Sequence, residues 1–134
     1  MTPPDTRENS MDRFDAIRNI TKADALRRVS GPQEQRSQEL FRHGSLQVKV
    51  YSPAGSDPQS PHIRDEAYVV IAGQGTFVSD AGRQSFEPGD FLFAPAGVPH
   101  RFEEFTSDFA VWVFFYGPEG GERRPRRASG DASV

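Results

Sequence analysis

Cysteine is absent from this 134-residue chain, which excludes disulfides, thiolate zinc sites and a cysteine nucleophile. Any metal site must therefore use nitrogen and oxygen ligands. Long apolar runs are also missing, because the longest, 67–72 and 109–116, are far shorter than the ~20 residues that span a bilayer. Neither sign of charge dominates, since 16 basic and 19 acidic residues give a net charge of −3. We therefore expect neither a membrane nor a nucleic-acid partner.

The length is that of one domain, and 35% hydrophobic with 26% charged residues is close to the globular norm. The first ten residues contain no apolar segment of the kind that export signals carry, so the sequence predicts a cytoplasmic protein. Residues 1–20 and 119–134 are polar and lack periodicity. Both segments are predicted to be disordered.

Residues 21–44 are predicted to form a short helix and a connecting segment. Thr21 is the expected N-cap, with the acidic Asp24 three positions later, and the helix is expected to end at Val29, before a Ser-Gly-Pro turn. Because its apolar positions are few, we expect this helix at the surface, as a lid or a dimer contact.

Residues 45–118 carry short apolar or alternating segments, separated by turn residues at intervals of about 8–12 residues. This pattern of short segments and turns is typical of an all-β sandwich or barrel. The last segment, 109–116, is apolar on both faces, so two sets of inward residues remain open. They are Ala110, Trp112, Phe114 and Tyr116, or Val111, Val113 and Phe115.

The most informative stretch runs from Gly89 to His100, in the pattern Gly, five residues, Pro-x-Gly, two residues, His. Its Pro95-Ala-Gly97 segment is turn chemistry, so His100 should begin a strand held on a rigid hairpin. Upstream, Glu66 is separated by six residues from Gly73. These two ordered patterns resemble the two signatures of the cupin family, specifically its small, single-domain, bacterial RmlC-like members.

The resemblance covers roughly Ser45 to Pro118 and implies a cupin-type double-stranded β-helix, a jelly-roll barrel that often holds one metal ion. The implied ligands are His62, Glu66 and His100. Cupins usually carry a further histidine where this chain has Ser60. The remaining set suits one divalent ion, iron, manganese, zinc or nickel. Whether Ser60, a water or His43 takes the vacant place stays open, as does whether the site binds metal at all.

Four residues are candidates for substrate binding. Arg64 is two residues from both His62 and Glu66, so an extended backbone would turn all three to one side. Phe102 shares the face of His100 by the same parity. Tyr68 and Trp112 complete the set. Among the other acidic residues, we expect Asp65 to be solvated, Asp90 to hydrogen-bond its turn and Glu104 to be structural or part of a substrate rim.

Two classes of function remain. The first is a metal-dependent enzyme that oxidises a small organic substrate in an oxygenase-like reaction, and the second is a non-catalytic small-molecule-binding protein with a degenerate or absent metal site. No catalytic residue is assigned, and cupins include isomerases as well. The folded part is only about 75 residues, a size at which a single core usually needs a second stabilising device. We therefore expect a homodimer, as is common in cupins.

Overall fold

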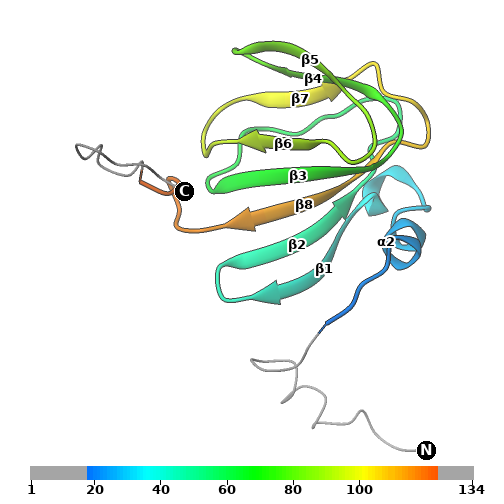
Figure 1. The fold of residues 1–134 in the computed structure, drawn as a ribbon, viewed down its shortest axis with the longest axis horizontal. Helices are drawn as coiled ribbons and strands as arrows, with labels where there is room; N and C mark the ends of the chain where they lie inside the picture. Colours follow the sequence, from blue (N-terminus) through cyan, green and yellow to red (C-terminus); the bar gives the residue numbers. More distant parts are fainter. Residues whose placement is uncertain (1–17, 124–134) are drawn as a thin grey trace, which may run out of the picture.

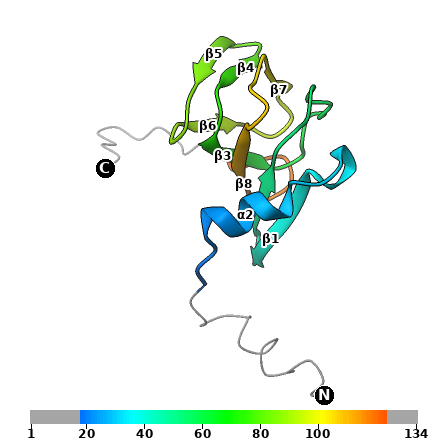
Figure 2. The same cartoon turned by 90° about the vertical axis from the view of Figure 1, so that its right-hand side faces the viewer.

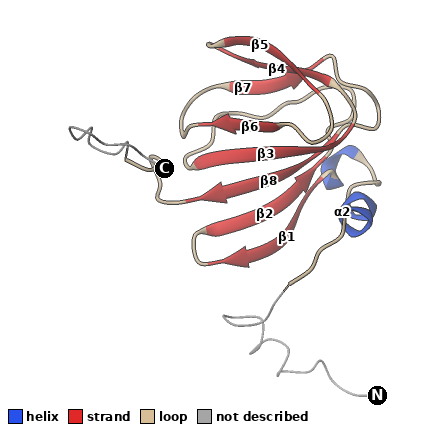
Figure 3. Ribbon diagram, viewed as in Figure 1, coloured by secondary structure: helices blue, strands red, loops and turns tan. Residues whose placement is uncertain are grey.

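The computed structural model describes residues 18–123, and the segments 1–17 and 124–134, predicted to be disordered, lie outside the described residues. Strands dominate the described part, which confirms the all-β prediction (Figure 3). The elements are α2 (Lys22–Arg28), the 3-10 helix η1 (Gln33–Gln35), β1 (Ser37–His43), β2 (Leu46–Tyr51), β3 (Asp65–Ala72), β4 (Gly75–Ser79), β5 (Gly82–Phe86), β6 (Phe91–Ala94), β7 (His100–Glu103) and β8 (Ala110–Tyr116). β1 thus precedes residue 45, where the barrel was expected to begin.

The strands form two antiparallel sheets, one of five strands in the order β1-β2-β8-β3-β6 and one of three in the order β5-β4-β7 (Figure 1). β3 lies between β8 and β6, so the strand that carries Glu66 is an interior strand of its sheet. β7, which begins at His100, pairs with β4 in the other sheet. The two signature motifs therefore reach the site from opposite sheets.

An aromatic core fills the space between the sheets. Phe102 and Phe109 are 1% and 0% exposed, and their ring centroids lie 4.8 Å apart. The same cluster contains Val111 and Val113, with Phe115 packed against it. The structure therefore selects the second inward set for β8, and Trp112 belongs to the other face.

Helix α2 packs on the outer face of the five-stranded sheet (Figure 2). Ala25 and Val29 are 0% and 2% exposed and contact Val50, which points outward from β2. The helix therefore lies at the surface, as expected, with most of its residues exposed, while its few apolar side chains cover one end of the sheet. Its start was predicted correctly, since the Thr21 hydroxyl accepts a hydrogen bond from the Asp24 amide at 3.0 Å.

The segment after β8 returns to the sheet instead of leaving it at once. The Gly120 amide donates to the Ile63 carbonyl at 2.7 Å, and the Glu122 amide donates to Asp65 Oδ2 at 2.7 Å. The polar composition of this segment did not predict these two contacts, because the segment contributes only backbone amides to them. Among residues 18–123, no helix combines the length and apolar character needed to cross a membrane.

Candidate metal centre

The two signature motifs are joined by backbone contacts. Gly97, in the turn before β7, donates its amide to the carbonyl of His62 at 2.7 Å, and the neighbouring Ala96 amide donates to Asp65 Oδ1 at 2.9 Å. Gly97 has φ +80°, a conformation that glycine adopts at little cost. Asp65 is thus buried and hydrogen-bonded, so the expectation that it is solvated was wrong. These contacts hold His62 beside the start of β7.

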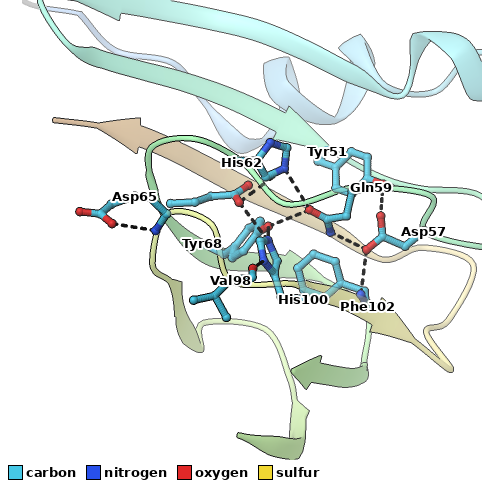
Figure 4. Close-up of polar contacts among 11 residues, drawn as sticks. Tyr51, Asp57, Gln59, His62, Asp65, Tyr68, Val98, His100 and Phe102 are labelled. Carbon is cyan, nitrogen blue, oxygen red and sulfur yellow. Dashed lines mark hydrogen bonds and ion pairs between the residues drawn. The ribbon is translucent and has the colours of Figure 1, made fainter. Parts of the chain in front are cut away.

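The donor atoms of His62, Glu66 and His100 lie within 4.8 Å of one another (Figure 4). Glu66 Oε1 is 3.0 Å from Nε2 of His100 and 3.7 Å from Nε2 of His62. Bonds of about 2.0–2.2 Å to one ion place neighbouring donors roughly 2.8–3.6 Å apart. The observed separations fit a shared divalent ion after small side-chain adjustments.

Burial differs sharply within this triad. The side chains of Glu66 and His100 are 4% and 2% exposed, whereas that of His62 is 36% exposed. The His62 ring meets Phe115 edge-on, with centroids 5.0 Å apart. His62 therefore stands at the mouth of the site, beside a surface hollow of about 560 Å³ that it lines together with Ile63 and Gly97.

His100 is oriented by its second ring nitrogen. Nδ1 is 2.8 Å from the Val98 carbonyl, which can only accept, so Nδ1 carries a hydrogen and Nε2 faces Glu66. Burial disfavours the imidazolium, but the hydrogen bonds to Glu66 and Val98 and the Glu66 charge outweigh it and raise the pKa of His100. A metal ion would replace the proton on Nε2.

Tyr68 contributes a buried hydroxyl to the same centre. Its oxygen lies 3.0 Å from His100 Nε2, and the residue is 1% exposed. Burial, with a further contribution from the Glu66 charge, raises the pKa of Tyr68 well above its usual value. The phenol therefore stays protonated at neutral pH and is a hydrogen donor at the site.

Sequence reasoning missed two residues, Asp57 and Gln59, which lie in the loop between β2 and β3. Gln59 Oε1 is 3.2 Å from His62 Nε2 and 3.4 Å from the Tyr68 hydroxyl, which donates to it. Asp57 is 9% exposed and accepts from Gln59 Nε2 at 2.5 Å. The loop has turn composition and no motif, so its sequence offered no signal for either residue.

Other predicted site residues lie elsewhere. Arg64 turns away and donates to the carbonyls of Ser45 and Gly117, which excludes the expected common face with Glu66. Trp112 packs on the outer face with the cluster under α2, so it does not line the barrel. Phe102 points inward as its parity predicted, but it is packed in the core.

Two further residues have definite places. Ser60 is exposed, and His43 ends β1 with its ring stacked on Phe41, 6.4 Å between centroids. Among residues 18–123, His43 is not part of the cluster of potential metal ligands.

Two acidic residues outside the site behave as expected. Asp90 accepts a hydrogen bond from the Glu87 amide at 3.0 Å within its turn, and Glu104 pairs with Arg83 at 2.9 Å.

A second hollow, of about 630 Å³ and lined by Gly75 and Glu104 among others, lies past the opposite end of β3. None of the three potential metal ligands lines it.

Residues 47–116 match the family model described as the cupin domain. The chain belongs to the cupin family. The match spans β2 to β8 and so includes all three potential ligands of the metal centre. It confirms the resemblance inferred from the spacing of Glu66, Gly73 and His100.

Three curated cupin relatives differ in how much of their length is shared. An uncharacterized protein of Streptomyces coelicolor is 32% identical over 83 residues, 60% of this chain and 79% of its own length. Acireductone dioxygenase 1 of Pectobacterium atrosepticum is 40% identical over 65 residues, 44% of this chain and 37% of the enzyme. Dimethylsulfoniopropionate lyase DddQ of Ruegeria pomeroyi is 33% identical over 70 residues, 51% and 35% of the two chains. The chain thus spans little more than a third of either enzyme.

Solved cupin structures support the fold. The crystal structure of a cupin 2 conserved barrel domain protein from Salinispora arenicola CNS-205 matches with a TM-score of 0.55 and 22% identity, over 78% of this chain and 91% of that protein. At this identity the likeness concerns the fold alone. With the two sheets and the antiparallel pairing, it confirms the double-stranded β-helix predicted for this cupin.

Proposed function

We propose that this cupin binds one divalent metal ion through His62, Glu66 and His100 and carries out an oxygenase-like oxidation of a small organic substrate. The convergence of two imidazole nitrogens and one carboxylate oxygen within 4.8 Å carries the proposal. Two histidines and one carboxylate are the donor set of non-haem iron(II) oxygenases. When bound, such an ion supplies a Lewis acid with open positions and, as iron(II), the electrons for dioxygen chemistry.

The surrounding side chains have separable roles in this proposal. The hydroxyl oxygen of Tyr68 lies 3.0 Å from His100 Nε2 and keeps its proton. It is placed to donate this proton, or a hydrogen bond, to a substrate oxygen. The Phe102 ring packs 5.0 Å from that of Tyr68 and keeps water from the inner side of the site. The half-exposed His62 leaves the outer side open, so a small substrate enters there.

Oxygen uptake tests the oxidation directly. Protein loaded anaerobically with iron(II) is mixed with acireductone, the compound in the name of one relative, and dissolved oxygen is followed. We expect uptake that falls by about 10–100-fold or more in Glu66→Gln, which keeps the side-chain shape but removes the charged ligand. Dimethylsulfoniopropionate serves as a second probe, since a lyase would consume it without oxygen uptake.

A non-catalytic binding protein is the second proposal, favoured by Ser60 in place of the usual histidine. It predicts no turnover of either probe by fully loaded protein. It also predicts that Glu66→Gln leaves the affinity for any bound small molecule nearly unchanged. Loss of both metal and turnover in that variant would instead remove this alternative.

We also propose a homodimer formed through the outer face of the five-stranded sheet. Pairing registers place Phe41, Val48, Phe114, Ala67 and Phe93 in one outward row that crosses all five strands. Phe91 and Phe93, on the edge strand β6, are 65% and 43% exposed. A continuous apolar face of this kind is typical of an interface.

Light scattering at micromolar concentration checks the dimer. We expect a mass of twice 14.9 kDa for the parent and of one chain for the double variant Phe91→Glu, Phe93→Glu, because two buried carboxylates oppose association. Gln84→Glu, which adds a carboxylate on the exposed strand β5, is the control and should remain dimeric. A monomeric parent would contradict the proposal.

A further inference from the structure

Gln59 lies at the metal centre and precedes Ser60, the position at which cupins usually carry a further histidine. Its amide oxygen is 3.2 Å from His62 Nε2, a separation that two donors of one ion would have. The same oxygen accepts from the Tyr68 hydroxyl at 3.4 Å, and it is also in hydrogen-bond contact with His62 Nε2, so a bound ion would replace the hydrogen between these two atoms. Gln59 is half-buried, so its side chain is held at the site and does not project into solvent.

The orientation of this amide is set by Asp57. The carboxylate of Asp57 accepts three hydrogen bonds, from the Tyr51 hydroxyl, from the Phe102 amide at 2.8 Å and from Gln59 Nε2 at 2.5 Å. A carboxylate accepts only, so the NH₂ group of Gln59 must face Asp57 and its oxygen must face His62 (Figure 4). Tyr51 on β2 and Phe102 on β7 fix Asp57 from both sheets, so the oxygen is held in place before any ion binds.

We propose that the Gln59 amide oxygen is the fourth protein ligand of the metal ion, with Asp57 as its positioning residue. The inference rests on the proposed metal-binding function and names its missing ligand. The resulting set has two nitrogen and two oxygen donors, where the usual cupin set has three histidines and a carboxylate. Carboxylate and carbonyl oxygens suit manganese among the transition-metal ions, whereas imidazole suits zinc, copper, iron and nickel. The second oxygen donor therefore makes the site more suited to manganese than an all-histidine site would be.

Calorimetric titration of the full-length protein with Mn²⁺ tests the inference without any assay of activity. Gln59→Leu retains the size of the side chain and removes the oxygen. We expect Gln59→Leu to raise the Kd by more than about 100-fold, because loss of groups that only orient ligands already costs about 10–100-fold. Gln84→Leu, on exposed strand β5, is the matched control and should bind as the parent does.

The visible absorption of bound Co²⁺ gives a second reading, because loss of a protein donor changes the coordination of the ion. The spectrum should change in Gln59→Leu and stay constant in Gln84→Leu, while equal thermal unfolding midpoints of the metal-free variants exclude a folding defect. If the parent binds metal and Gln59→Leu shows the same Kd and spectrum, the inference is overturned and the three-ligand site stands. If the parent binds neither Mn²⁺ nor Co²⁺, the proposed metal-binding function itself is contradicted, and with it the fourth ligand.

Discussion

Replacing His100 with alanine is expected to reduce the metal content from about one ion per chain to a trace. His100 is buried, and the Val98 carbonyl already aims its Nε2 at Glu66, so the ion loses a preorganised ligand. Loss of groups that merely orient ligands costs about 10–100-fold in affinity, and loss of a ligand should cost more than about 100-fold. Elemental mass spectrometry of protein purified without an affinity tag measures the content directly.

The chain contains its own control for this experiment. His43→Ala changes a histidine at the end of β1, outside the cluster of ligands, and should retain the ion. Because alanine leaves the buried Glu66 carboxylate without its partner, His100→Gln provides a polar variant that separates metal loss from unfolding. An ion that persists at the parental level in both His100 variants would place the metal site elsewhere. If the parent holds no ion after anaerobic loading with iron(II), the metal-dependent oxidation is rejected and the non-catalytic binding protein remains.

Replacing Gly73 with alanine is expected to destabilise the protein by more than about 3 kcal/mol. Gly73 follows β3 with φ +86°, where an L-residue costs roughly 1–2 kcal/mol. A Cβ at this position would also lie 2.5 Å from Phe109 Cα and 2.8 Å from its nitrogen. Backbone atoms cannot move aside as a side-chain end can, so the turn or the start of β8 must shift. Urea unfolding measures the loss.

Gly89→Ala separates the two contributions. Gly89 has φ +93°, close to that of Gly73, but a Cβ there would meet nothing within 4 Å. We therefore expect a loss of only about 1–2 kcal/mol from the backbone conformation. Equal losses of unfolding free energy in the two variants would show that the clash of a Cβ at position 73 with the Phe109 backbone adds nothing to the destabilisation.

The three potential metal ligands were predicted from the resemblance to the cupin signatures, and local turn contacts hold two of them in place. The Pro95-Ala-Gly97 turn aims His100 into the barrel, and the same turn hydrogen-bonds the His62 backbone. Arg64 shows where such reasoning fails. Parity assumes an extended backbone, but Arg64 lies in a bend just before β3 begins at Asp65, so its side chain turns to Ser45 and Gly117.

The sequence by itself determined the all-β class, the cupin signatures and the triad of His62, Glu66 and His100, because periodicity, turn residues and motif spacing are local properties. Only the tertiary structure decided which face of β8 lines the barrel, since both faces are apolar and helix α2 covers part of the outer one. It alone also brought Gln59 to the metal centre. That placement depends on Asp57 and on partners from β2 and β7, which are distant in sequence and meet only when the sheets close around the core.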